Sequence, residues 1–457
     1  MKKAILLFSF FFFSFFGLAA EPAGQGSPPE PITLEQARVL ALLNSRSLAR
    51  YNLAVQSNLL NERLHSYSNL PSFSLGATAS SSLWTSDGVP QDLARDSFSA
   101  GVNFGVSQRL WNGGRSAILR AIYSLNTEIS RQDALAEFYA VLNTADNFYY
   151  AVLEAAAALE VAESSLATAR LSLEIAEIQR ESGMISQAAF LHALAEMAGR
   201  ETTRNQSRRD LAVANLRLMD LLGLTQTPEP VPVDFSEYED LISLLSDSGD
   251  DAADRLFAAL WNQIQTRNPF MVRAALGARR SERNVGLAAR DYSPTLSASL
   301  STGLTHNIDS GLEASGGRLS LSASFPIDVW VTAANVERQR IAREQAALDY
   351  LSAISSLDIE LRTLILDIVS NAGLIRSSRR ALDYALLHFD FVLELYRLSG
   401  NSPSDLSDAE TLVRNNRNQL NRSQFAFLTG LSRIRSIGVF DSDEEIVALI
   451  SSVLAQQ

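Results

Sequence analysis

Cysteine and histidine, which often carry out catalysis, are respectively absent and scattered in this 457-residue chain. It has no cysteine, and His65, His192, His306 and His388 do not have the spacing of metal ligands. The chain also lacks a Gly-x-Ser-x-Gly nucleophile motif, a Walker loop and a Gly-x-Gly-x-x-Gly motif. The paired carboxylates at 444–445 are typical of a solvated surface. The sequence therefore predicts no enzyme, no cofactor and no metal site.

One group of polar residues does have a spacing with a physical meaning. Ser402, Pro403 and Asp405 match the N-cap, N1 and N3 positions of a helix, which predicts a capping box. A carboxylate at N3 also interacts favourably with the helix dipole. Asp408 lies one turn further on and is less needed for the cap, so it is the better candidate for another role.

Elsewhere the chain contains strands of alternating polarity. In segment 97–110, Phe98, Val102 and Phe104 share one parity, whereas Ser, Gly and Asn hold the other, which predicts a strand with one apolar face. The motif Trp111-Asn112-Gly113-Gly114-Arg115 then ends the alternation. The same alternation recurs over 73–83, 296–304 and 319–327, so two β-hairpins are expected, at 71–111 and 294–330.

Long helices fill most of the remaining sequence. Between Ser116 and Arg180, apolar residues and alanines alternate at spacings of three and four residues, which favours coiled-coil packing. At ~1.5 Å per residue, this helix would be a rod of roughly 100 Å. Further helices are predicted over 33–66, 186–222, 256–292, 332–398 and 402–438.

The two halves of the chain follow the same programme. Pro294 follows Pro71 by 223 residues, Gly400 follows Gly183 by 217, and both helix breaks have the sequence Arg-x-Ser-Gly. This internal duplication defines two repeats of a helix–hairpin–helix unit. Predicted boundaries are 33–224 for the first repeat, 225–254 for an acidic, proline-containing linker or equatorial segment, 255–438 for the second repeat and 439–457 for a C-terminal tail. For 225–254 a solvated linker is the preferred interpretation.

The N-terminus has the features of an export signal. Lys2 and Lys3 precede an apolar run, and Ala20 ends a small-residue cleavage site, so 1–20 is predicted to be a signal peptide and 21–32 a flexible start. A membrane anchor is the alternative, but the run is short for a bilayer. The chain has no cysteine for lipid attachment, and its net charge of −12 disfavours a nucleic-acid partner.

Four strands are too few to close a barrel, and open sheet edges do not persist in lipid. Strands with an apolar outer face therefore predict an oligomer, in which a dimer would supply eight strands and a trimer twelve. Trp84, Trp111 and Trp330, the last two expected at the ends of strands, fit the aromatic girdles of a membrane barrel. Ordinary burial is the alternative for each of them.

Four features together resemble the TolC-like outer-membrane efflux family, the outer-membrane factors. These are the junction Gln108–Arg115, a proline before each hairpin at Pro71 and Pro294, the duplication, and a glycine followed by a capping serine at each helical turn. The resemblance implies a mainly α-helical homotrimer with a twelve-stranded transmembrane β-barrel continuous with a long periplasmic α-helical barrel.

The same resemblance implies partners and sites. The channel would dock, directly or through a periplasmic adaptor (membrane fusion protein), to an inner-membrane pump of the RND, ABC or MFS type. The implied periplasmic aperture involves Asp405 and Asp408, with Tyr396 just before the break. The implied docking turns contain Arg180, Ser182, Gly183 and Ser186 in the first repeat, and Arg397, Ser399, Gly400 and Ser402 in the second.

The leading hypothesis is an outer-membrane exit duct, which could serve small-molecule efflux or type I protein secretion. The rival is an exported coiled-coil structural or adhesive protein that never enters a membrane. That rival explains the heptads but not the four alternating strands. An exported hydrolase is a distant third, because it would need a nucleophile constellation.

Overall fold

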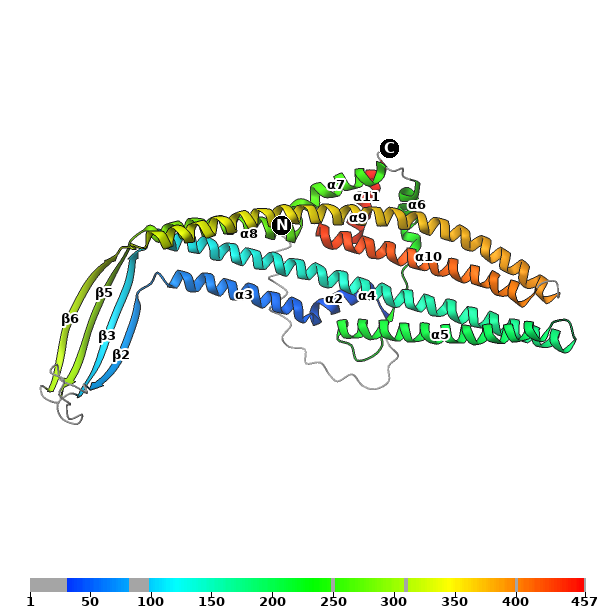
Figure 1. The fold of residues 1–457 in the computed structure, drawn as a ribbon, viewed down its shortest axis with the longest axis horizontal. Helices are drawn as coiled ribbons and strands as arrows, with labels where there is room; N and C mark the ends of the chain where they lie inside the picture. The colour runs from blue at the N-terminus through cyan, green and yellow to red at the C-terminus, as the bar shows by residue number, and fades with distance from the viewer. Residues whose placement is uncertain (1–30, 82–97, 248–250, 308–310, 399–401, 456–457) are drawn as a thin grey trace.

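The protein is a long rod with strands at one end and helical turns at the other (Figure 1). Its structure, a computed structural model, describes residues 31–81, 98–247, 251–307, 311–398 and 402–455. The expected signal peptide, Trp84, Ser399 and Gly400 lie outside the described residues. The predicted separation into a β end and a turn end is confirmed.

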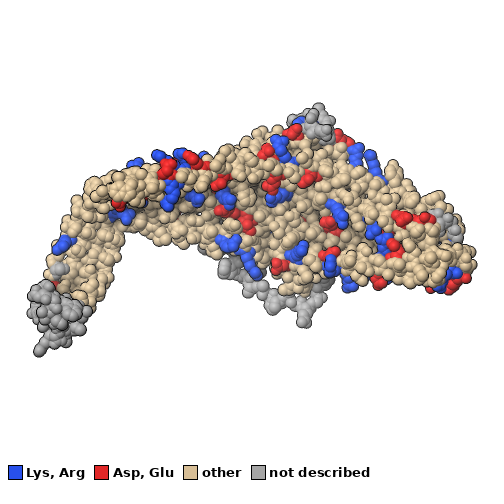
Figure 2. Space-filling view, in the orientation of Figure 1, with Lys and Arg blue, Asp and Glu red and all other residues tan. Residues whose placement is uncertain are grey.

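The β end is one open antiparallel sheet. Its strands follow the order β2 (Ser72–Ser81), β3 (Phe98–Trp111), β5 (Thr295–Asn307) and β6 (Gly311–Ser324). One face exposes apolar side chains such as Phe73 and Leu319, which are 71% and 79% exposed. The other carries serine pairs such as Ser297 with Ser322, whose hydroxyls are 2.8 Å apart. Charged residues are sparse on the visible face of the sheet (Figure 2).

The second hairpin ends earlier than the alternation indicates. β6 stops at Ser324, and the prediction that Trp330 ends a strand is wrong, since Trp330 lies in the first turn of α9 (Val329–Arg397). Pro326 explains the difference, because proline has no N–H to donate to a strand ladder and favours the end of a strand. Phe325 and Ile327 therefore continue the polarity pattern without continuing the strand.

Two long helices run the length of the rod, and shorter helices pack along them end to end. α4 (Arg115–Glu181) is flanked by α3 (Arg46–Tyr67) and α5 (Gln187–Leu222), and α9 is flanked by α8 (Pro269–Ala289) and α10 (Pro403–Gly438). Five of the eight predicted seam residues of α4 are buried, and the other three are half-buried. The buried ones are Val152, Ala162, Leu166, Ala169 and Ala176, and the half-buried ones are Ala155, Leu159 and Leu173. None of the helices that the structure describes is long and apolar enough to cross a membrane.

Each repeat begins with two helices where the sequence predicts one. The first pair, α2 (Leu34–Asn44) and α3, separates at Ser45, whose hydroxyl caps α3 by accepting from the Leu48 N–H. The second pair, α7 (Asp251–Arg267) and α8, separates at Asn268, which caps α8. Asn268 follows Ser45 by 223 residues, the spacing of the two prolines before the hairpins, so the break belongs to the duplication.

The acidic segment is part of the core, and its prediction as a solvated linker is wrong. β4 (Glu229–Pro230) pairs in parallel with β1 (Pro31–Ile32), so the predicted flexible start already contains a strand at its end. α6 (Glu239–Asp247) buries three apolar side chains on one face, and its carboxylates pair with arginines of α9. The segment needs no basic residues because α9 supplies them. The buried side chains are Leu241, Ile242 and Leu245.

The C-terminal tail forms helix α11 (Asp443–Leu454), which packs against α6 and α7 and buries Ile446 and Ile450. These three helices make a layer on one side of the rod near its middle (Figure 1). They add a second layer to the helices there.

A buried ionic cluster joins this layer to the rod. Asp146 of α4 is fully buried and accepts hydrogen bonds from Arg38 of α2 and Arg435 of α10. Asp443 of α11 pairs with the same two arginines, at 2.7 Å from Arg38 and 3.2 Å from Arg435. Each carboxylate thus has two guanidinium partners, which offsets the cost of burying charge. The cluster ties both ends of the described chain to the centre of the molecule.

Candidate functional site at the helical turns

The first helical turn closes α4 with a glycine and opens α5 with a serine. α4 ends at Glu181, and Gly183 adopts a φ of 73°, which places its N–H 3.0 Å from the Arg180 carbonyl. That left-handed conformation strains any residue with a side chain, so glycine is required. Ser186 then caps α5, since its hydroxyl accepts from the Ala189 N–H at 3.2 Å. The predicted glycine-then-serine turn is confirmed here.

Arg180 and its neighbours form the surface of this turn. The Arg180 guanidinium lies 4.1 Å from the centre of the Phe190 ring, a cation–π contact that joins α4 to α5. Ile178, Met184 and Leu191 around it are all exposed, with Met184 at 64%. Ser182 is also exposed, and its hydroxyl donates to the Ile178 carbonyl. The tip of the first repeat therefore exposes apolar side chains together with the polar Arg180 and Ser182.

The second turn begins α10 with the predicted capping box. The Asp405 N–H donates to the Ser402 hydroxyl at 3.3 Å, and the Ser402 N–H donates to the Asp405 carboxylate at 2.8 Å. The backbone hydrogen bond from Ser402 is the main reason that the pKa of Asp405 is lowered, and the Ser402 hydroxyl adds to it. Pro403 occupies the first turn of the helix. Arg397 ends α9 on the other side of the turn.

Asp408 is the uncommitted carboxylate of this turn. It lies on α10 one turn beyond the cap and is exposed. Among the residues that the structure describes, it forms no hydrogen bond and no ion pair. Its charge is therefore available to whatever approaches the end of the rod.

Tyr396 lies inside the molecule rather than on its tip. Its side chain is fully buried, its hydroxyl donates to the Ser172 carbonyl at 3.0 Å, and burial raises its pKa. The Tyr396 carbonyl accepts from the Gln179 side-chain amide at 3.2 Å. Tyr396 follows Gln179 by 217 residues, so equivalent positions of the two repeats meet here. This contact holds the end of α9 against α4.

A second contact between the two repeats, which the sequence pattern does not predict, lies further along the rod. Arg200 of α5 is buried and pairs with Glu410 of α10 at 2.8 Å and with Glu196 at 2.6 Å. It also donates to the Thr411 hydroxyl at 2.9 Å. The i,i+4 spacing of Glu196 and Arg200 was the available signal, but that spacing alone is typical of a solvated helix face. The partner on α10 follows from the tertiary fold.

Two of the three tryptophans expected in membrane girdles, Trp111 and Trp330, lie at the boundary between the sheet and the helices. Trp111 is the last residue of β3 and is half exposed, and Trp330 is 67% exposed. At this boundary Gly113 has a φ of 65°, and a Cβ there would come within 2.2 Å of the Ser293 Cβ. The tight junction after Trp111 therefore needs glycine. No group of histidine, aspartate or glutamate residues in the described ranges could hold a metal ion.

Comparison with known proteins identifies the class. The family described as outer membrane efflux protein matches residues 37–224 and 260–437. No curated protein sequence matches the chain significantly. Among solved structures, the CmeC outer membrane channel of Campylobacter jejuni has a TM-score of 0.74 at 14% identity. The alignment covers 96% of this chain and 94% of the CmeC chain. At this identity the likeness concerns the fold.

Two further structures share the fold. CusC, whose structure is described in connection with transmembrane channel formation, has a TM-score of 0.72 at 20% identity. The alignment covers 93% of this chain and 95% of the CusC chain. The outer membrane protein VceC of Vibrio cholerae has a TM-score of 0.71 at 15% identity, covering 89% of this chain and 96% of its own.

The family match spans most of the chain, so the protein belongs to the outer membrane efflux protein family. It is accordingly an outer-membrane exit duct of the kind used by tripartite efflux systems. The family is one of channels rather than enzymes, and the alternative of an exported structural protein is not favoured.

Proposed function

We propose that three copies of the chain form one continuous duct, with a twelve-stranded barrel in the outer membrane and a helical tunnel in the periplasm. The observation that carries this proposal is the open four-stranded sheet, whose apolar face is exposed and whose edge strands β2 and β6 have no outer partner among the described residues. Lipid does not tolerate unpaired backbone edges, so β6 of one copy would pair with β2 of the next. Serine-rich faces would then line the water-filled interior.

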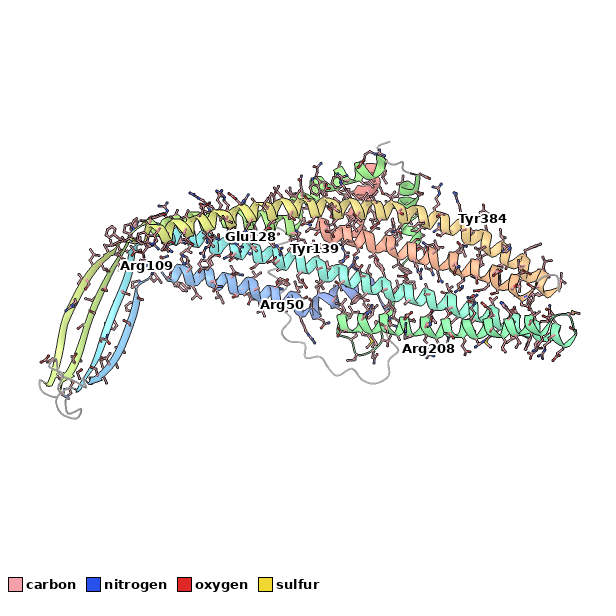
Figure 3. All side chains as sticks on the ribbon, viewed as in Figure 1. Arg50, Arg109, Glu128, Tyr139, Arg208 and Tyr384 are labelled. Atoms are coloured by element: carbon pink, nitrogen blue, oxygen red, sulfur yellow. The ribbon has the colours of Figure 1, made fainter. Side chains whose placement is uncertain are left out.

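Exposed apolar stripes on the helices support the same assembly. On α9, Ile359 and Leu366 are seven residues apart, as are Tyr384 and Phe391, and all four are exposed. Tyr384 is labelled on α9 in Figure 3. On α3, at the other side of the protomer, Leu53 and Leu60 are exposed with the same spacing. Seven-residue apolar spacing is typical of a seam between helices, so a second copy is the natural partner.

The helical turns are proposed as the docking surface for a periplasmic adaptor or an RND, ABC or MFS pump. The exposed apolar tip around Arg180, Ser182, Gly183 and Ser186 supports this role in the first repeat. The equivalent positions Arg397, Ser399, Gly400 and Ser402 complete the proposal. Because the chain has no cysteine, a single Ser182→Cys substitution can carry a thiol-attached photo-cross-linker, which we expect to capture an inner-membrane partner in cells, whereas the same label at Ser377→Cys on α9 should not.

Asp405 and Asp408 are proposed to form a cation-selective aperture where three copies of α10 begin. Asp408 is the stronger candidate because it is exposed and has no ion-pair or hydrogen-bond partner among the described residues, whereas Asp405 is engaged in the cap. Tyr396 would support the aperture from inside, by holding α9 against α4. Three carboxylates in a ring repel anions and bind multivalent cations.

Conductance in planar bilayers tests the aperture. We expect Asp408→Ala to raise conductance or weaken block by multivalent cations, and the double variant with Asp405→Ala to do so further. The matched control is Asp220→Ala, an exposed carboxylate at the far end of α5. Unchanged conductance and block in both single variants and the double variant would remove the gating role.

Export is proposed to depend on residues 1–20 as a cleaved signal peptide. The charged start and apolar run support this, as does the outer-membrane family of the chain. Mass spectrometry of protein purified from outer membranes should give a mature N-terminus at Glu21. An intact Met1 in that material would contradict cleavage.

A further inference from the structure

A groove of about 550 Å³ lies between α4, α5 and α10, away from the helical turns and the sheet. Its floor is apolar, with Phe148 and Val161 among the alanines of α4. Its rim contains three arginines, Arg217 from α5 and Arg414 and Arg422 from α10. Volumes of roughly 300–1,000 Å³ are typical of sites for small organic molecules.

The arginines of the rim are poorly neutralised. Arg217 and Arg422 are exposed and form no ion pair or hydrogen bond within the described part of the chain. The buried Arg414 Nε has no hydrogen-bond acceptor among the described residues, and its ion-pair partner, Glu410 Oε1, is 4.0 Å away. Two carboxylates also line the groove, of which Glu154 interacts electrostatically with Arg422 and Asp210 is already paired with Arg209 at 2.7 Å, so the three arginines still outnumber their counter-charges. The groove therefore carries excess positive charge in a protein whose net charge is −12.

The groove lies on the face of the rod that the α6, α7 and α11 layer leaves uncovered. Ala155 on its floor follows Asp146 by nine residues, which is about two and a half helical turns, so the two side chains point to opposite sides of α4. Asp146 points toward the layer through its contacts with Arg435. In the proposed tunnel the layer would lie on the outside, where it does not obstruct the lumen, and we place the uncovered face toward the lumen.

We propose that this groove binds amphiphilic organic anions during export, with the apolar body on the alanine floor and the carboxylate, sulfonate or phosphate near Arg217 and Arg422. Charge complementarity and the apolar floor select this class over inorganic ions, which would leave the floor empty. The inference rests on the proposed tunnel, because only there does the groove meet the exported substrate. It assigns the duct a substrate-binding surface of its own.

Fluorescence titration of the full chain in a non-ionic detergent tests the proposal. The probes are 8-anilinonaphthalene-1-sulfonate and N-phenyl-1-naphthylamine, which share the same aromatic body with and without a sulfonate. In the double variant Arg217→Gln with Arg422→Gln, we expect the dissociation constant of the sulfonate to rise about tenfold, as for the loss of a charged hydrogen bond. Binding of the uncharged probe should not change.

The control variant is Arg208→Gln, an exposed arginine of α5 that does not line the groove (Figure 3). It should bind both probes as the unaltered chain does. Equal sulfonate affinity in the double variant, or an equal loss for both probes, would overturn the proposal. Trimer formation and conductance, measured on the same material, distinguish failure of the groove proposal from failure of the proposed duct. Conducting trimers without the sulfonate site contradict only the groove, whereas absent trimers contradict the duct itself.

Discussion

At the scale of single residues, Asp146 matters most for the centre of the molecule. It is fully buried, and it contacts Arg38, Arg435 and the Ser432 hydroxyl. Both arginines also reach Asp443, so one carboxylate organises the contacts of four helices. Removing Asp146 would leave two guanidinium groups to share Asp443, and this uncompensated buried charge is more costly than never having had the cluster.

We therefore expect Asp146→Ala to lower the free energy of unfolding by about 3–5 kcal/mol. The matched control is Asp133→Ala on the same helix, which breaks the solvent-exposed pair with Arg273 and should cost about 0–1 kcal/mol. Thermal unfolding in detergent, followed by circular dichroism, measures both. Equal losses for the two variants would show that the buried cluster adds nothing to stability.

The cap at Asp405 should respond to acid. The pKa of Asp405 is lowered in the folded chain from an ordinary 3.8. The ionised carboxylate therefore stabilises the start of α10 above pH 3.8, and this stabilisation is lost as the pH falls through the lowered pKa of the folded chain. After correction for intrinsic rates, amide hydrogen exchange at the start of α10 should accelerate below about pH 3.8 relative to neutral pH.

The start of α5 is the built-in control for that experiment. Ser186 caps it in the same way, but Ala189 stands where α10 has Asp405, so this turn has no carboxylate to protonate. The pH effect should also disappear in Asp405→Asn. A similar acceleration at both turns would mean that acid loosens the tip of the rod generally.

Residues differ in how well the sequence predicts their position and contacts. The caps at Thr33 and Ser402 were predictable, because a cap depends on residues three positions apart, and both form in the structure. The ion pair of Arg200 with Glu410 was not, since its members are far apart in sequence and meet only when the two repeats pack. Tyr396 was expected at the aperture, whereas its buried position depends on α4.

At the scale of elements, each strand of the sheet has one apolar face and one serine-rich face. Leu319 and Ser320 are neighbours on β6 and point to opposite faces, the first to the exposed apolar side and the second toward the serine-rich side, opposite Ser299. A membrane barrel makes these faces unequal in their tolerance of charge.

Leu319→Asp should therefore impair folding into lipid far more than Ser320→Asp. For a strand in a membrane, a charge on the lipid face costs on the order of 2–4 kcal/mol near the midplane, with less for Asp, and little on the lumen face. The yield of protein folded into vesicles, scored by protease resistance, measures the difference. Equal yields would argue against a lipid-facing apolar side.

Periodicity predicted the long elements well and their interruptions poorly. The helices 116–180 and 402–438 match α4 and α10, because heptads and caps are both local signals. The apolar pattern runs on across Ser45 and Asn268, so it concealed two breaks. The acidic segment was misinterpreted because its charges are paired by α9, which no local pattern reveals.

At the scale of the whole molecule, duplication explains the shape. Two helix–hairpin–helix repeats place both hairpins at one end and both turns at the other, and the Gln179–Tyr396 contact joins equivalent positions. One protomer still leaves an apolar sheet face, two sheet edges and a helical stripe uncovered. The proposed assembly of three copies would cover all of these surfaces at once.

The most direct test of this account is the mass of the assembly extracted from outer membranes, measured by native mass spectrometry in a non-ionic detergent. The account predicts a particle of three chains, found in the outer-membrane fraction and released by detergent but not by salt or urea. A monomer that washes off the membrane without detergent would contradict the duct, because a single open sheet cannot form a water-filled channel.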